Sequence, residues 1–217
     1  AVDAVVEELK KIAIPVGDRD QIARVAALSA HEEAIAQLLA DAMDKVGRDG
    51  VITIEESKSL SDVLEFVEGV RIDRGYLSPH FVTDADRMEV ALEEPMFLLT
   101  DQKISSPTEI VPIMEKVING GGRPLVVIAE DVDGEALATM VINKARGTLA
   151  CVAIKAPGFG ERRKALLEDI ALLTGATVIS ADTGLKIEET ELSHLGSARR
   201  MVANKDESTV IEGRGPA

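Results

Sequence analysis

The sequence has little cysteine, few aromatic residues and a shortage of positive charge. Its one cysteine, Cys151, excludes an internal disulfide and is typical of a reducing compartment, so we expect a cytoplasmic protein. Aromatic residues make up 2% of the chain, with no tryptophan, so the core must be aliphatic. A net charge of −14 argues against nucleic acid and anionic membrane surfaces as partners. No apolar run approaches the roughly 20 residues that span a bilayer, and we recognise no signal peptide.

Residues 130–146 are predicted to form a helix with more apolar surface than one sheet can cover. Acidic residues open it, basic residues close it, and Gly147 stops it. Its apolar residues span roughly two-thirds of the circumference, whereas packing on a sheet needs a stripe of only about 100°. The pattern leaves two interpretations open, a helix buried on two sides or a helix whose surplus face binds a partner. The residues concerned are Leu137, Met140, Val141 and Ile142.

Residues 104–119 predict a second helix of similar character. Ser106 and Glu109 have the spacing of a capping box, and Pro107 suits the first helical position. The apolar residues that follow lie within about 160° of arc, with Val111 at one border.

The composition changes near Gly69, and the sequence predicts a smaller, mostly helical part before it and an α/β part after it. The first part contains expected helices at 1–14, 18–28 and 29–46 and strands at 51–55 and 64–72. Ser29 and Glu32 have the spacing of a capping box that would open the third helix. Apolar strands that alternate with helices indicate parallel strands covered on both faces. We therefore expect a partly parallel sheet flanked by helices. Its expected strands are 88–92, 96–100, 125–129, 149–155 and 177–180, with a helix at 161–173 and a closing hairpin at 198–205 and 209–212.

No pattern of catalytic or metal-binding residues stands out. The loop Pro157–Gly160 lies between a strand and a helix, as a phosphate-binding loop would, but it lacks a full glycine fingerprint. Nucleotide binding there remains an alternative to a plain turn. Three histidines lack metal-ligand spacing, and Cys151 has the setting of a buried strand residue. The acidic pairs 130–131 and 188–189 suit solvated faces or helix caps.

Three long stretches resemble the GroEL-type (group I) bacterial chaperonin. They are residues 69–79 (GVRIDRGYLSP), 128–138 (IAEDVDGEALA) and 155–160 (KAPGFG), and shorter matches occur at 42–47, 50–53 and 171–175. The resemblance implies a protein-folding, stress-response subunit of which this chain covers the middle. It assigns residues 1–14 to the end of an equatorial segment, 15–68 to an intermediate-domain segment and 69–217 to most of the apical domain, without its last helices.

The resemblance also implies what this part of the chain binds. Partners would be non-native polypeptides, the mobile loop of a co-chaperonin, and sister subunits in a ring of seven. ATP and Mg²⁺ would bind to parts of the subunit outside this chain, so the fragment itself would not be an enzyme. Hinges would lie at Pro15 and Gly69. Carried over residue by residue, the binding face in a groove between the two helices comprises Tyr76, Ser78, His80, Phe81, Val111, Met114, Leu137, Val141 and Ile142, with Asn143 and Arg146 beside it.

The chain departs from the family pattern at three places. His80 stands where the family usually has tyrosine. The glycine turn at 120–122 is one residue longer than usual, and the chain near His31 is one residue shorter.

Overall fold

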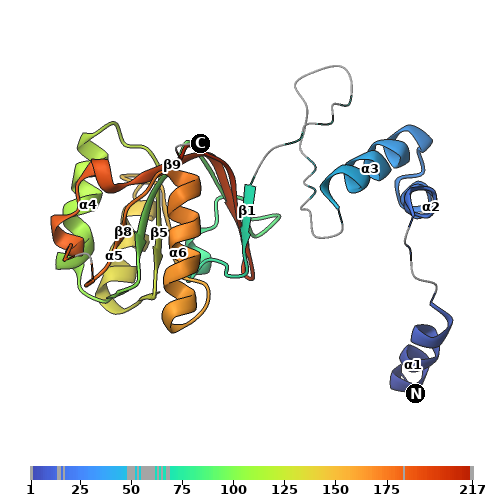
Figure 1. Cartoon of the computed structure of the whole chain (residues 1–217), viewed down its shortest axis with the longest axis horizontal. Coiled ribbons are helices and arrows are strands. Elements are labelled where there is room, and N and C mark those ends of the chain that lie inside the picture. The colour runs from blue at the N-terminus through green and yellow to red at the C-terminus, as the bar shows by residue number, and fades with distance from the viewer. Residues whose placement is uncertain are drawn as a thin grey trace. The chain divides into compact units, whose positions relative to one another are not determined.

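The computed structural model describes residues 2–13, 16, 18–47, 52, 54, 62, 64, 66, 69–182 and 184–215. The chain divides into two compact units, residues 1–66 and residues 67–217 (Figure 1). The predicted hinge Pro15 and most of the predicted strand 51–55 lie outside the described residues.

The first unit is helical. Its helices are α1 (Val2–Ile12), α2 (Arg19–Ala30) and α3 (Glu33–Val46). Helices α2 and α3 contact each other, and buried alanines on both helices allow close approach. The capping box expected at Ser29 is wrong: Ser29 lies in the last turn of α2, the chain reverses at His31 with φ 57°, and Glu32 precedes α3 without a side-chain cap.

The second unit confirms the α/β prediction. A mixed sheet carries helices α4 and α5 on one face and α6 on the other (Figure 1). The strands are β1 (Gly69–Ile72), β2 (Val90–Glu93), β3 (Met96–Thr100), β4 (Lys103–Ile104), β5 (Leu125–Ala129), β6 (Asp131–Val132), β7 (Cys151–Lys155), β8 (Val178–Ile179), β9 (Gly196–Ala203) and β10 (Ser208–Gly213). The α-helices are α4 (Pro107–Asn119), α5 (Gly134–Ala145) and α6 (Gly160–Thr174). Three 3₁₀ turns are η1 (Pro79–Phe81), η2 (Ile187–Glu189) and η3 (Leu192–His194).

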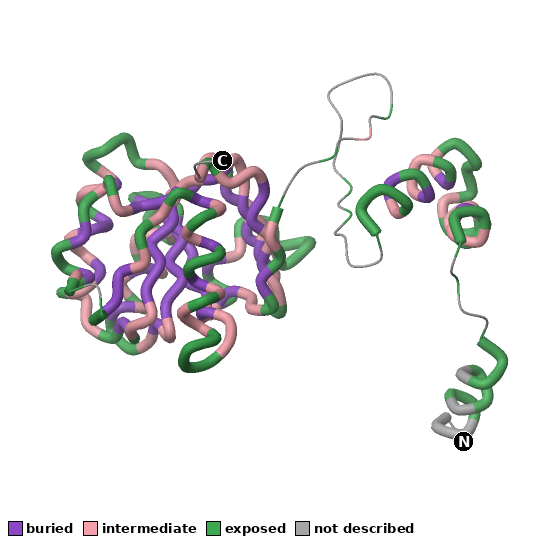
Figure 2. The backbone as a smooth tube through the Cα atoms, viewed as in Figure 1, coloured by how far each residue is buried: buried purple, intermediate pink, exposed green. Residues whose placement is uncertain are grey.

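The sheet combines a parallel half with an antiparallel half. Strands β8, β3, β5 and β7 lie next to one another in that order and are parallel. Strand β9 joins them by pairing antiparallel with β3, and it also pairs with β10 and β2. Strand β5 is buried along its whole length, and β3 and β7 are buried except at one end residue each, as Figure 2 shows, because helices cover both faces of the sheet there.

The helix predicted over residues 130–146 begins later than expected. Asp131 and Val132 form the short strand β6, which pairs in parallel with β4, and α5 starts at Gly134. The φ of Gly134 is +54°, a left-handed conformation that favours glycine and here separates strand from helix.

Gly69 begins β1 and pairs with Ile211. A Cβ atom at Gly69 would lie 2.6 Å from the carbonyl oxygen of Val210, so this strand pairing requires glycine. Its role as a hinge stays a prediction.

Candidate functional site

Helix α4 begins with the predicted capping box. The Ser106 side chain accepts a hydrogen bond from the Thr108 N–H, and the Glu109 carboxylate accepts one from the Ser106 N–H at 2.8 Å. These bonds satisfy N–H groups that a helix start leaves free, and they fix the position of the first turn.

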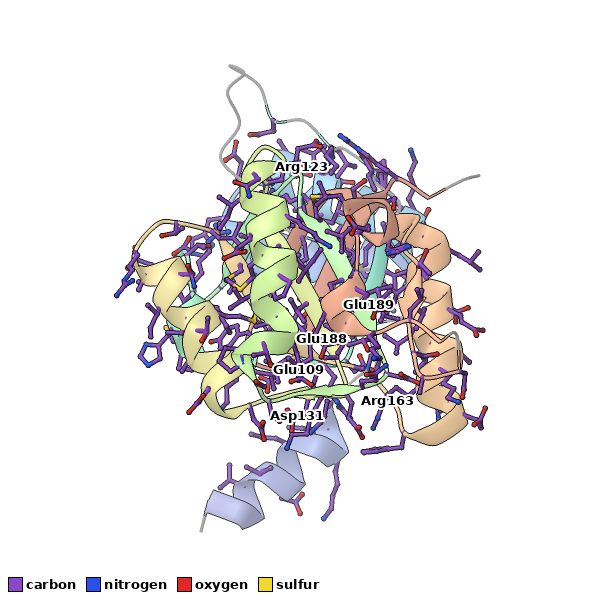
Figure 3. The ribbon with its side chains drawn as sticks, turned by 90° about the vertical axis from the view of Figure 1, so that its left-hand side faces the viewer. Glu109, Arg123, Asp131, Arg163, Glu188 and Glu189 are labelled. Carbon is purple, nitrogen blue, oxygen red and sulfur yellow. The ribbon has the colours of Figure 1, made fainter. Side chains whose placement is uncertain are left out.

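Ser105 links the starts of α4 and α5, a role that the sequence did not reveal. Its N–H donates to Glu109 of α4 at 2.9 Å, and its hydroxyl donates to Asp133 beside α5 at 2.6 Å. Its carbonyl oxygen also accepts from the Ala136 N–H at 3.1 Å. Figure 3 shows Glu109 and Asp131 at this end of the two helices. The two helices are therefore held side by side where they begin.

Asp133 also pairs with Lys103, 2.5 Å away. The hydrogen bond from Lys103, and then the one from Ser105, lower the pKa of the Asp133 carboxyl group, and the same contact raises the pKa of Lys103. Both side chains remain close to half exposed, so the pair orients the start of α5 and adds little stability.

The aliphatic side chains predicted to be surplus on α5 are partly accessible. Ile142 is 48% exposed, and Leu137 and Val141 are half-buried. On α4, Val111 is half-buried as well. We call these four residues, Val111, Leu137, Val141 and Ile142, the two-helix surface. Met140 is fully buried, so only three of the four apolar residues considered on this helix are accessible.

Four residues of the predicted binding face are buried. Phe81 and Met114 have 0% and 2% of their surface exposed, and Tyr76 and Ser78 are buried too. The core needs these side chains: Phe81 closes the η1 turn over the sheet, and Met114 lies on the inner side of α4. Their part in binding stays a prediction. The remaining predicted residues, His80, Asn143 and Arg146, are exposed, half-buried and exposed, respectively.

The loop Pro157–Gly160 lies at the edge of the parallel strands. The loop follows β7. Sheets of this kind bind ligands where the strand order reverses, and here that point lies between β3 and β8, away from the loop. Arg163, in the first turn of α6, pairs with Glu130 at 2.6 Å, and Lys164 pairs with Asp182. Figure 3 shows Arg163 and Asp131 toward the same end of the fold. This geometry favours an ion-paired turn over a phosphate-binding loop.

The acidic pairs serve in different ways. Glu130 pairs with Arg163, and Asp131 pairs with Lys155 at 3.5 Å. Both carboxylates therefore form ion pairs in addition to the solvated or capping role expected from the sequence. Glu188 and Glu189 are exposed beside α4 (Figure 3). Within the described part of the chain, no group of three or more histidine, cysteine or acidic residues could hold a metal ion.

Cys151 is a buried residue of β7, as predicted. Its thiol donates to the carbonyl oxygen of Met140 at 3.4 Å, and burial raises its pKa from 9.0 to about 12, with a small opposing effect of Lys144. We expect no reaction with a maleimide at pH 8 in the folded protein and full reaction in denaturant, measured by mass spectrometry. An exposed thiol introduced by Ser193→Cys supplies the reactive control, and rapid native-state labelling of Cys151 would contradict the burial.

Above pH 9 the Cys151 thiol loses its proton in the unfolded chain before it does so in the folded one. The free energy of unfolding therefore falls as the pH rises towards 12.

No described helix is both long and apolar enough to cross a membrane. The fold and the two-helix surface define an α/β domain that offers accessible aliphatic side chains on adjacent helices, as proteins that bind other polypeptides do. A model of the TCP-1/cpn60 chaperonin family matches residues 1–217. The chain therefore belongs to the TCP-1/cpn60 chaperonin family, which gives it a general role in protein folding.

Proposed function

We propose that this chain is the intermediate and apical part of a group I, GroEL-type chaperonin subunit and that it binds non-native polypeptides. The observation that carries the proposal is the partial exposure of aliphatic side chains along α4 and α5, above all Ile142 at 48%. Binding by buried apolar area depends on no particular sequence, because each square ångström contributes about 25 cal/mol whichever side chain supplies it. Such a surface suits many unfolded clients.

The same surface would bind the mobile loop of a co-chaperonin. Client and mobile loop would then compete for the same aliphatic side chains. In the complete subunit, ATP and Mg²⁺ bound outside this chain would drive rotation of the apical part about Gly69, and seven subunits would form the ring. The exposed His80, Arg146 and the half-buried Asn143 border the surface and would provide its polar rim.

The proposal predicts that the chain discriminates between folded and unfolded forms of one client. We expect a reduced, carboxymethylated protein with a fluorescent label to bind at least tenfold more tightly than its native form, measured by fluorescence anisotropy. Absolute affinity should be weak, because a single chain lacks the avidity of a ring. Calorimetric titration with Mg-ATP should give no saturable heat. Equal binding of both client forms would contradict the proposal, and a saturable ATP site would favour a nucleotide-binding domain.

A further inference from the structure

The η1 turn, which carries His80 and Phe81, is fixed to the sheet on its upstream side. The Tyr76 N–H donates to the Asn204 carbonyl oxygen at 3.0 Å, and the Leu77 N–H donates to the Ala153 carbonyl oxygen at 2.9 Å. These two bonds hold the chain before the turn.

On its downstream side, the turn is held by a lysine from α5. The Lys144 ammonium group donates to the carbonyl oxygen of Val82 at 2.8 Å, and this contact is partly buried. Val82 is the residue that ends η1, because its N–H donates to the Pro79 carbonyl oxygen. Among the described residues no carboxylate pairs with Lys144 within 4.0 Å, so its polar contact is to this neutral oxygen.

Lys144 lies on the same side of α5 as two residues of the two-helix surface. It follows Val141 by three residues and Leu137 by seven, and helical neighbours at these spacings share a face. The aliphatic stem of a lysine can extend an apolar stripe while its charged end reaches a polar partner. Lys144 therefore joins the side of α5 that carries Leu137 and Val141 to the η1 turn.

We propose that Lys144 is a positioning residue that holds η1 against α5, so that His80 on η1 and the two-helix surface bind a client as one surface. The inference rests on the proposed polypeptide-binding function. When the contact is lost, only the upstream bonds and the buried Phe81 ring hold η1, so the turn moves more, and a client that contacts both elements must order it as it binds. That ordering lowers affinity without removing any side chain of the two-helix surface.

The test compares Lys144→Met with the unmodified chain. Methionine matches the lysine side chain as far as Cε, so it keeps the apolar stem, but it cannot donate to Val82. We expect amide hydrogen exchange at Phe81 and Val82 to accelerate about tenfold, measured without client by NMR or mass spectrometry. Affinity for the carboxymethylated client should fall three- to tenfold, and Lys144→Arg, which can still donate, should recover most of it.

Lys116→Met provides a matched control on α4. Lys116 also binds a carbonyl oxygen, that of Thr190 at 2.8 Å, and it pairs with Glu191 at 2.7 Å. Loss of the Lys116 contacts should accelerate amide hydrogen exchange around η2 and η3 and leave amide exchange at Phe81 and Val82 unchanged.

Each result decides the inference. Faster η1 exchange together with weaker client binding, in Lys144→Met alone, supports it. Unchanged exchange at η1 overturns it, and so does faster exchange with unchanged affinity, which would leave the two-helix surface as the binding site without η1. Failure of the unmodified chain to bind the client would instead refute the proposed function, and this inference with it.

Discussion

A chain with Val141→Ser and Ile142→Ser should lose most of its ability to capture an unfolded client. Each change replaces an aliphatic side chain of the two-helix surface with a smaller polar one. Because apolar burial contributes about 25 cal/mol per Å², we expect binding to weaken by about 2 kcal/mol, or roughly thirtyfold. Fluorescence anisotropy with the carboxymethylated client measures this directly.

The matched control is Leu172→Ser. Leu172 is 68% exposed on α6, which covers the other face of the sheet, so it tests whether any exposed aliphatic residue would serve. We expect its affinity to stay within twofold of the unmodified chain. Val141 is half-buried and packs against the core, so the double variant should lose about 1 kcal/mol of stability, and circular dichroism must show that it stays folded. Unchanged capture by a folded double variant would reject the two-helix surface as the binding site.

The elements of the α/β unit could be predicted because their local signals agree with their packing. The run Leu125–Ala129 is apolar throughout and lies between helices on both faces, so its pattern and its burial coincide. The capping box at Ser106 was found for the same reason, since its hydrogen bonds are local in sequence. The capping pattern at Ser29 failed because α2 continues through it, and only the reversal at His31 ends that helix.

The candidate site was only partly predictable because exposure depends on contacts between distant segments. Helical periodicity identified Leu137, Val141 and Ile142 as residues that one sheet could not cover, and all three are at least partly accessible. Periodicity also included Met140, which is fully buried. The family resemblance added Phe81, but residue identity alone does not show that its ring faces the core.

The long-range contacts of Lys144 and Lys116 gave no signal in the sequence. Lys144 and Val82 are 62 residues apart, and Lys116 and Thr190 are 74 residues apart. Each contact joins a charged side chain to a backbone oxygen, so the acceptor residue carries no recognisable side-chain type. Such contacts become visible only when the fold brings the segments together.

Gly75→Ala should destabilise the α/β unit more than any other small change discussed above. A Cβ atom at residue 75 would lie 2.1 Å from the carbonyl oxygen of Asn204 and 2.2 Å from the carbonyl carbon of Lys205. Both are backbone atoms in the turn between β9 and β10, so neither can rotate away. We expect a loss of at least about 3 kcal/mol, which corresponds to a melting temperature roughly 10 °C lower for a domain of this size.

The control for this prediction is Gly122→Ala. Gly122 has a φ of +67°, and a Cβ atom added there would meet no atom of the described residues within 4 Å. Alanine at this position is therefore strained in its backbone but does not clash. That strain costs about 1–2 kcal/mol. A melting temperature for Gly75→Ala at or above that of Gly122→Ala would contradict the close backbone contact.

The same variant should disturb the binding surface from a distance. Moving residue 75 away from the β9–β10 turn breaks the bond from the Tyr76 N–H to the Asn204 carbonyl oxygen, which is one of the two that fix the chain before η1. Tyr76 is the only tyrosine of a chain without tryptophan, so its fluorescence reports on this segment alone. We therefore expect altered tyrosine emission and weaker client binding in Gly75→Ala at temperatures where the unit remains folded. If the emission and affinity are unchanged under those conditions, the anchoring of η1 through Tyr76 does not contribute to client binding.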